Sequence, residues 1–180
     1  MRDNKVRMIV EGGIMLALAV ILNSIRLYKM PQGGSITLGG YVPLFLFALR
    51  WGLGPGIILG ALYGVIDFMI DPVFLTPIQV FLDYILSYGM FGLAGIGKNE
   101  KTDEGTINLG MISGLILGSI GRLLAAVVSG YVFFREYLPQ DVNPIIASFM
   151  YNLTYIIPNV IICLIITFLI IKPISRVNRR

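Results

Sequence analysis

Apolar residues fill most of the chain in continuous runs and do not alternate with polar residues, as they would along half-buried strands. A helix needs roughly 20 apolar residues to cross the hydrocarbon core of a membrane. The runs predict an all-α integral membrane protein in which residues 1–180 form a single transmembrane domain. We expect six transmembrane helices, at 7–27, 41–50, 53–70, 75–97, 107–133 and 144–172, with the second one short.

Charged residues are scarce and gather between the apolar runs. They make up 13% of the chain, against about 25% in soluble domains, while 56% of the residues are hydrophobic. One set of connections, together with both chain ends, holds ten Lys and Arg residues, whereas the opposite set holds Arg26, Lys29 and Arg135. Positive charge collects on the cytoplasmic side of membrane proteins. We therefore expect both termini and the loop 98–106 in the cytoplasm, and the loop 28–40 outside as a lid.

Four polar residues share one face of the segment 75–97. Their spacings of three and four residues place them on one side of a helix: Thr76, Gln79, Asp83 and Ser87. An ionisable residue inside a membrane is costly unless it is paired or lines a wet cavity. Arg122 could pair with Asp83, but we expect Arg122 in the inner half of its helix and Asp83 in the outer half. The polar face is therefore predicted to line a substrate cavity.

The segment 144–172 carries a second polar face at a similar depth, formed by Ser148, Asn152 and Tyr155. A buried asparagine can simply hold two helices together. Two polar faces at one depth, however, favour a shared cavity between the two segments.

Aromatic rings accompany both polar faces, since Tyr84 follows Asp83 and Tyr151 precedes Asn152. A ring beside a carboxylate suits a flat, cationic heteroaromatic ligand, through stacking and cation–π attraction. The acids that the charge count places on the outer side also favour a cationic solute. They are Asp67, Asp71, Glu136 and Asp141.

Nothing in the sequence provides catalytic machinery. It contains no histidine, a single cysteine (Cys163) inside an apolar run, and no glycine-rich phosphate loop followed by Lys-Ser/Thr. We therefore expect no enzymatic activity, no bound metal, no cofactor and no nucleic acid partner. The energy for any transport would come from a partner or an ion gradient.

Small residues mark one face of the first helix. Gly13 and Ala17 are spaced four apart, which lets another helix approach closely. That helix could belong to this domain or to a membrane partner.

The chain resembles the thiamine-specific S components of energy-coupling factor (ECF) transporters. The resemblance lies in the segments MPQGGSITLGGYVPLF (30–45), LRWGLGPGIILGALYG (49–64), PIQVFLDY (77–84) and VNPIIASFMYNLTY (142–155). It implies six helices with both ends inside a prokaryotic cell membrane, and a vitamin bound near the outer surface beneath the loop 28–40. It also implies that Gly13 and Ala17 dock to a transmembrane coupling protein, which works with two cytoplasmic ATPases.

The resemblance also implies roles for single residues. Asp83 would face the vitamin, Tyr84 would be its aromatic neighbour, and Asn152 would bond the pyrimidine ring. Some relatives carry a histidine where Ala126 aligns and tryptophans for stacking, both of which are missing from the outer side here. We expect Phe134 to take one stacking role. The complete set of expected substrate-binding residues is Tyr63, Gln79, Asp83, Tyr84, Phe134, Ser148, Tyr151, Asn152 and Tyr155.

These observations predict a membrane-embedded, substrate-binding subunit for thiamine uptake. Two other interpretations remain open: an S component for riboflavin, a thiamine precursor or another heterocycle, and a stand-alone secondary transporter with Asp83 as proton carrier. Six helices without an inverted repeat argue against the transporter. A membrane enzyme would need a nucleophile, a base or a metal cluster, which the sequence does not offer.

Overall fold

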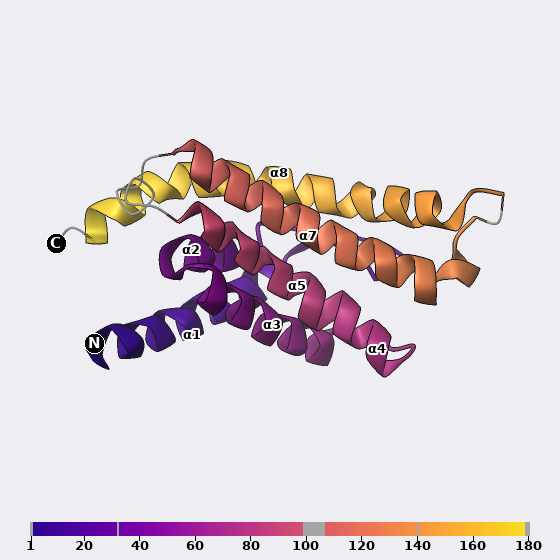
Figure 1. Ribbon diagram of the computed structural model, residues 1–180, viewed down its shortest axis with the longest axis horizontal. Coiled ribbons are helices and arrows are strands. Elements are labelled where there is room, and N and C mark those ends of the chain that lie inside the picture. The colour runs from indigo at the N-terminus through magenta and orange to yellow at the C-terminus, as the bar shows by residue number, and fades with distance from the viewer. Residues whose placement is uncertain (1, 32, 99–106, 140, 179–180) are drawn as a thin grey trace.

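The computed structural model describes residues 2–31, 33–98, 107–139 and 141–178, and most of them are helical. Figure 1 shows a bundle of long helices, and the chain also forms one short two-stranded hairpin. In chain order the elements are α1 (Arg2–Ser24), β1 (Arg26–Lys29), β2 (Ser35–Thr37), α2 (Val42–Trp51), α3 (Leu53–Ile70), α4 (Pro77–Val80), a π-helical turn (Phe81–Leu86), α5 (Ser87–Gly89), a 3-10 segment (Met90–Gly97), α7 (Leu109–Phe133), a 3-10 turn (Arg135–Tyr137) and α8 (Pro144–Asn178). Of the expected loop 98–106, only Lys98 lies within the described residues.

The described part of the chain contains five stretches of helix that are long and apolar enough to cross a membrane. Their mean hydropathies run from 1.4 to 2.5, and they are Asp3–Ser24, Leu53–Ile70, Pro77–Gly97, Leu109–Phe133 and Pro144–Ile170. They correspond to five of the six helices expected from the sequence. The remaining one, α2, is apolar but has only 10 residues. At about 1.5 Å per residue it reaches about 15 Å, half the thickness of a hydrocarbon core.

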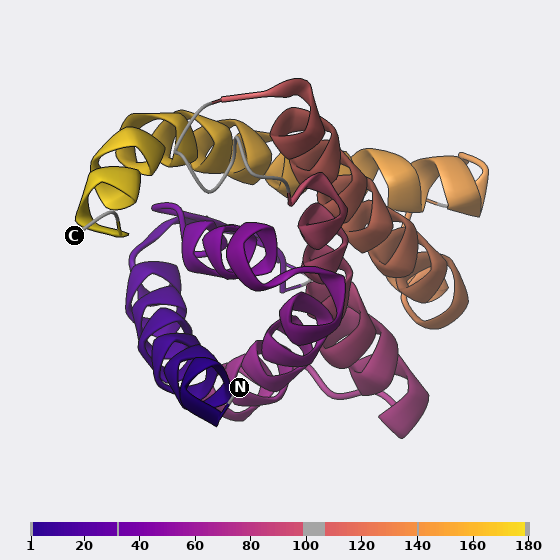
Figure 2. The ribbon, with the colours of Figure 1, turned by 60° about the vertical axis from the view of Figure 1, so that its left-hand side comes forward.

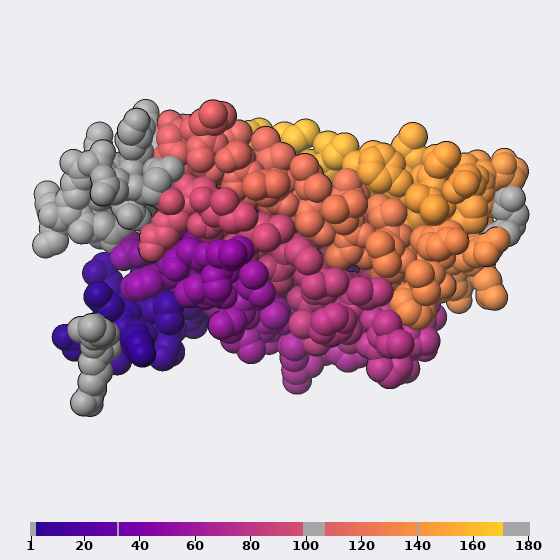
Figure 3. All heavy atoms as spheres, in the orientation of Figure 1, coloured from indigo at the N-terminus to yellow at the C-terminus, as the bar shows by residue number. Residues whose placement is uncertain are grey.

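The surface of α7 shows why such a bundle suits lipid. Its exposed apolar side chains recur every three or four residues, as on one face of a helix: Ile116, Ile120, Leu124 and Val128. Its polar residues Ser119, Arg122 and Ser129 are buried instead. Along the face seen in Figure 3, the side chains of α7 and α8 close against one another. An apolar exterior around polar interior groups is the arrangement that a membrane requires.

Local sequence sets where the helices begin and end. Thr76 Oγ1 accepts a hydrogen bond from the Gln79 backbone N–H at 3.1 Å, and Pro77 occupies the first turn, so α4 begins there. Asn108 caps α7 in the same way, at 3.0 Å from the N–H three residues on. Gly52 separates α2 from α3 with a φ of +93°, a conformation that favours glycine.

Glycines let α3 lie against the segment that contains α4 and α5. A Cβ at Gly60 would collide with the backbone of Tyr88, and a Cβ at Gly64 with the backbone of Tyr84. Asp67 follows Gly64 by one turn, and the close approach brings it into hydrogen-bond contact with Tyr88. The same packing therefore places Asp67 beside Tyr88 in the interior of the bundle.

The expected all-α architecture holds apart from one hairpin. The predicted first helix, 7–27, is wrong at its end, because α1 stops at Ser24 and Arg26–Lys29 pairs with Ser35–Thr37 as an antiparallel hairpin. Asn159 of α8 extends this pairing, since its Oδ1 accepts the backbone N–H of Thr37 at 2.9 Å and its Nδ2 donates to Ser35 O at 2.7 Å. The segment predicted as a lid loop is thus partly a tethered hairpin.

The helices alternate in direction, so the chain gathers different segments at the two ends of the bundle. α1 begins and α8 ends at the same end (Figure 1). The turned view shows α2 lying between α1 and α8 (Figure 2). At the opposite end, the hairpin meets the end of α3, the beginning of α4, the end of α7 and the beginning of α8.

Candidate functional site

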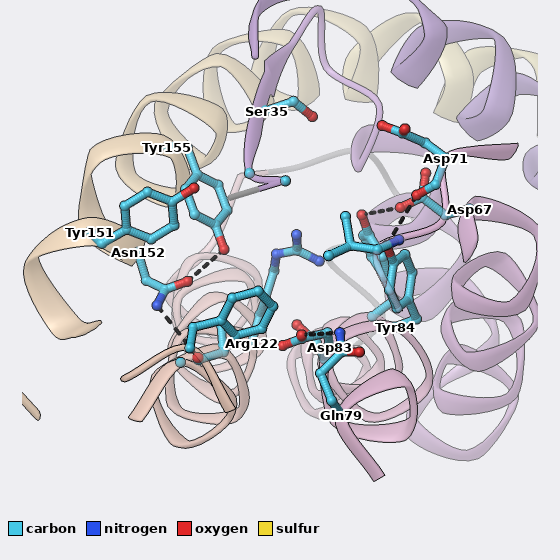
Figure 4. Close-up of a pocket in the computed structure, with 18 of the residues that line it drawn as sticks. Ser35, Asp67, Asp71, Gln79, Asp83, Tyr84, Arg122, Tyr151, Asn152 and Tyr155 are labelled. Atoms are coloured by element: carbon cyan, nitrogen blue, oxygen red, sulfur yellow. Dashed lines mark hydrogen bonds between the residues drawn. The ribbon is translucent and has the colours of Figure 1, made fainter. Parts of the chain in front are cut away.

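A cavity lies at the end of the bundle that carries the hairpin. The space between its lining side chains, including the part open to solvent, is about 880 Å³. The lining comes from the hairpin, α3, the segment containing α4 and α5, α7 and α8 (Figure 4).

Gln79 and Asp83 form one wall of the cavity. Gln79 Nε2 donates to Asp83 Oδ2 at 2.6 Å, while Gln79 Oε1 accepts the backbone N–H of Leu75 at 3.1 Å. The amide is therefore held at both ends and fixes one carboxylate oxygen. Asp83 lies in the π-helical turn Phe81–Leu86, and such turns are frequent at functional sites.

Asn152 and Tyr155 form the facing wall (Figure 4). Asn152 Nδ2 donates to Ser148 O at 2.8 Å and to Ala126 O at 3.4 Å, and Asn152 Oδ1 accepts the Tyr155 hydroxyl at 2.6 Å. Ser148 Oγ donates to Val127 O at 2.9 Å. These bonds tie α8 to α7 and fix the orientation of the buried amide.

Aromatic rings flank both walls. The Tyr84 hydroxyl donates to Asp71 O at 3.0 Å and accepts the N–H two residues further on at 2.9 Å, which fixes this ring against the connection between α3 and α4. Tyr151 and Phe134 line the cavity from α8 and from the end of α7. The three rings come from different elements, so a ligand between the walls meets aromatic surface on more than one side.

Arg122 of α7 extends between the two walls (Figure 4). It is only 6% exposed, and its guanidinium carbon lies 4.1 Å from the ring centre of Tyr88 and 4.8 Å from that of Tyr41. Asp67 lies beyond Tyr88 and accepts that tyrosine's hydroxyl at 2.6 Å and Asn23 Nδ2 at 2.9 Å. Three polar side chains from α1, α3 and α5 thus connect to the buried arginine.

The hairpin contributes the remaining part of the lining. Arg26 and Lys29 of β1 contact Asp71 at 2.5 Å and 2.9 Å. The hydrogen bond from Lys29, together with Arg26, holds the pKa of Asp71 below its usual range. Gly34 lies against the ring of Tyr155, so closely that a Cβ there would come within 3.0 Å of ring atoms. The hairpin is therefore fastened to α3 by charge and fits against α8 by shape.

The structure brings most of the expected binding residues together. Eight of the nine line the cavity: Gln79, Asp83, Tyr84, Phe134, Ser148, Tyr151, Asn152 and Tyr155. The ninth, Tyr63, is not part of the lining; it is 1% exposed, and its ring packs 4.8 Å from that of Tyr88. Gly13 and Ala17 lie on the exposed face of α1, and apart from the adjacent residues and backbone of α1 itself no described atom comes within 4 Å of a Cβ placed on Gly13. The assignment of the nine residues to ligand binding, and of Gly13 and Ala17 to docking, stays a prediction.

The expected separation of Arg122 from Asp83 is wrong, because both line the same cavity. Sequence reasoning also missed the contribution of Tyr88, and that of Asp67, which it treated only as an acid on the outer side. A usable signal was present: Asp67 and Arg122 are opposite charges within predicted spans, and such charges need each other or a wet cavity.

The charge of the lining favours a cation. Its carboxylates are Asp67, Asp71 and Asp83 and its cationic side chains are Arg26 and Arg122, which together carry one net negative charge. Among the described residues, no group of three or more Cys, Asp or Glu side chains is placed to hold a metal ion. The cavity offers carboxylates, amides and rings, an arrangement suited to holding a small, flat cation without covalent chemistry.

Sequence comparisons point to one family. Residues 9–178 match the model of the family described as thiamine transporter protein. A curated relative, the thiamine transporter ThiT of Bacillus subtilis (strain 168), is 34% identical over 177 residues, which cover 93% of this chain and 92% of the relative. A second, the thiamine transporter ThiT of Lacticaseibacillus paracasei, is 25% identical over 123 residues, covering 63% and 61%.

A solved structure shares the fold. ThiT from Listeria monocytogenes superposes with a TM-score of 0.82 at 23% identity, covering 94% of this chain and 96% of that one. The family resemblance noted in the sequence is thus confirmed by a family match over nearly the whole chain. The chain belongs to the thiamine transporter protein family.

Proposed function

We propose that this chain is a membrane-embedded subunit that binds thiamine for uptake into a prokaryotic cell. The observation that carries the proposal is the pairing of Asp83 with an amide rather than with a cation. Gln79 donates to Asp83, and within the described part of the chain no ion pair involves this carboxylate. A buried carboxylate without a cationic partner is costly unless a ligand supplies the positive charge.

Thiamine matches the cavity part by part. Its thiazolium ring carries a permanent positive charge that Asp83 would offset, with Tyr84 beside it. Its aminopyrimidine ring presents donors and acceptors to Asn152, whose amide is already oriented by Tyr155 and Ser148. Tyr151 and Phe134 provide ring surface for stacking. Riboflavin has no such cation and would leave the charge of Asp83 unmatched, so it fits the cavity less well.

The topology that completes this proposal has six crossings with both termini in the cytoplasm, α2 being the short one. The excess of Lys and Arg at the connections near the two chain ends supports it. With this orientation, the cavity opens to the outside and the hairpin covers its entrance as a lid. Thiamine from outside would then reach the site directly.

Energy for release into the cell would come from partners. The sequence has no phosphate-binding loop for ATP, and the exposed small residues Gly13 and Ala17 of α1 offer a place for close helix packing. We assign them to docking with an ECF transmembrane coupling protein, which would act with two cytoplasmic ATPases. A proton-driven transporter acting alone would instead move thiamine without these subunits.

Equilibrium binding to the purified, detergent-solubilised chain tests the proposal. Calorimetric titration with thiamine should give saturable one-to-one binding, and titration with riboflavin should give none. If the chain bound riboflavin and not thiamine, riboflavin would be assigned as the substrate instead. If folded protein bound neither, the proposed function would be overturned. Uptake by cells or vesicles lacking the ATPases would favour the stand-alone transporter.

A further inference from the structure

A chain of polar contacts runs behind the cavity from α1 to α7. Asn23 Nδ2 donates to Asp67 Oδ1 at 2.9 Å, and the Tyr88 hydroxyl donates to Asp67 Oδ2 at 2.6 Å. The guanidinium carbon of Arg122 lies over the Tyr88 ring, 4.1 Å from its centre. Asp67 and Arg122 therefore contact opposite parts of one tyrosine.

This arrangement couples the two charges through the ring. A hydroxyl that donates to a carboxylate becomes more electron-rich, and the ring then attracts a cation on its face more strongly. Arg122 needs such compensation because it is 6% exposed and, within the described part of the chain, its Nε and Nη1 have no hydrogen-bond partner. A buried guanidinium without a counter-charge would be costly in a membrane.

The five charged side chains of the lining form two pairs and leave one carboxylate over. Arg26 is matched by Asp71 in direct contact. Arg122 is matched by Asp67 through Tyr88. Asp83 then remains as the lining carboxylate that, among the described residues, makes no ion pair, which leaves it free to contact a cationic ligand.

We propose that Asp67 is a positioning residue that sets specificity for a cationic ligand: through Tyr88 it offsets the charge of Arg122 and so keeps Asp83 available to the ligand. The inference rests on the proposed function, since it concerns the same cavity. Without the Asp67 charge, the guanidinium of Arg122 would repel a thiazolium ring and draw the carboxylate of Asp83 toward itself. A neutral ligand would feel neither effect.

The substitution Asp67→Asn removes the charge while keeping an oxygen that can accept the Tyr88 hydroxyl. We would titrate wild type and variant with thiamine and with its deaza analogue, in which carbon replaces the charged ring nitrogen. Asp67→Asn should weaken thiamine binding by about tenfold or more and binding of the neutral analogue by less than about threefold. Asp141→Asn, an exposed acid outside the cavity, is the matched control and should change neither.

A second arm isolates the link to Arg122. In an Arg122→Gln background there is no charge for Asp67 to offset, so adding Asp67→Asn should cost less than about threefold in thiamine affinity. If Asp67→Asn does not fold, Tyr88→Phe takes its place, because it keeps the ring and removes only the hydroxyl bond to Asp67. Tyr88→Phe should also weaken binding of thiamine more than binding of the neutral analogue, but by a smaller factor than Asp67→Asn.

The outcomes separate the two proposals. Equal losses for thiamine and the neutral analogue, or an undiminished loss in the Arg122→Gln background, would mean that Asp67 serves packing alone and would overturn this inference. Wild-type protein that binds no thiamine would instead overturn the proposed function.

Discussion

Hydrogen bonds hold single side chains of the cavity in a fixed orientation before any ligand binds. Asn152 shows this most clearly, because its Nδ2 donates to the carbonyls of Ser148 and Ala126 while its Oδ1 accepts the Tyr155 hydroxyl. A side chain fixed in this way loses little conformational entropy when a ligand binds. Preorganisation of this kind favours tight binding over fast exchange.

Replacing Asn152 by alanine should therefore reduce thiamine affinity. The change removes a polar partner for the pyrimidine ring and leaves the buried Tyr155 hydroxyl without its acceptor. We expect a loss of about tenfold to a hundredfold in affinity, since the group of the pyrimidine ring that would bond Asn152 is then buried in the complex without a partner, which costs about 1–3 kcal/mol. Calorimetry measures it, with Thr154→Ala on the exposed side of α8 as control. Wild-type affinity in Asn152→Ala would remove this residue from the site.

At the scale of elements, the hairpin is the one that the apolar pattern of the sequence did not predict. It is held from two directions: by Asn159, which bonds the backbone of Ser35 and Thr37, and by Asp71, which binds Arg26 and Lys29. Asn159 is fully buried, whereas the pairs with Asp71 are partly exposed. We therefore expect the first tether to fix the hairpin's place and the second to adjust how long it stays closed.

Loss of the buried tether should show in kinetics. Asn159→Leu leaves the Thr37 N–H and the Ser35 carbonyl without this partner, so the hairpin should open more often. We expect thiamine to dissociate about tenfold faster or more, as measured by stopped-flow fluorescence. Thr154→Ala is again the control on the same helix, and an unchanged dissociation rate in Asn159→Leu would contradict the hairpin's role as a lid.

The exposed tether should depend on pH. Because the folded pKa of Asp71 lies below its usual value of 3.8, its stabilising contribution is complete above that value and is lost as the pH falls through the lowered pKa. Asp71→Asn should release thiamine faster than wild type by a constant factor above about pH 5, and the two rates should converge in stronger acid. A ratio that does not change with pH would show that the Asp71 charge does not hold the hairpin.

The same elements show what sequence could predict. The apolar runs located five long helices to within a few residues, because lipid exposure demands continuous apolar side chains. Spacings of three and four placed Gln79 beside Asp83 and Ser148 beside Asn152, since a helix repeats with that period. The hairpin was missed because its strands are only 4 and 3 residues long, and their bonding depends on Asn159, distant in the chain.

Contacts between helices were harder to predict than positions along one helix. Arg122 was placed by depth within its own segment, but its surroundings depend on how α7 lies against α5 and α2. Tyr63 was expected at the cavity, yet it packs behind Tyr88 because Gly60 and Gly64 bring α3 so close to the next segment. No single segment of sequence carries that information.

At the scale of the whole molecule, the cavity and the proposed docking face lie on separate surfaces. The cavity is enclosed by the hairpin end of the bundle, while Gly13 and Ala17 lie on the exposed side of α1. α1 connects to the cavity through Asn23 and its bond to Asp67. Binding and energy coupling should thus be separable by mutation.

A large side chain at the docking face should abolish transport and spare binding. Gly13→Trp or Ala17→Trp would block close helix approach without touching the cavity lining. We expect thiamine affinity within about twofold of wild type, and uptake near background in cells that carry the coupling protein and ATPases. Leu124→Trp on the exposed face of α7 is the matched control. Lost binding in the α1 variants would mean that these residues serve internal packing.

The central claim is that Asp83 matches the positive charge of thiamine, and the most direct measurement compares Asp83→Asn with wild type on thiamine and its neutral deaza analogue. Both affinities would be measured by calorimetry on protein shown to be folded. We predict a loss of about a hundredfold for thiamine and less than about threefold for the analogue, because only the cation loses its counter-charge. Equal losses for the two ligands would contradict charge matching and return Asp83 to a role in packing.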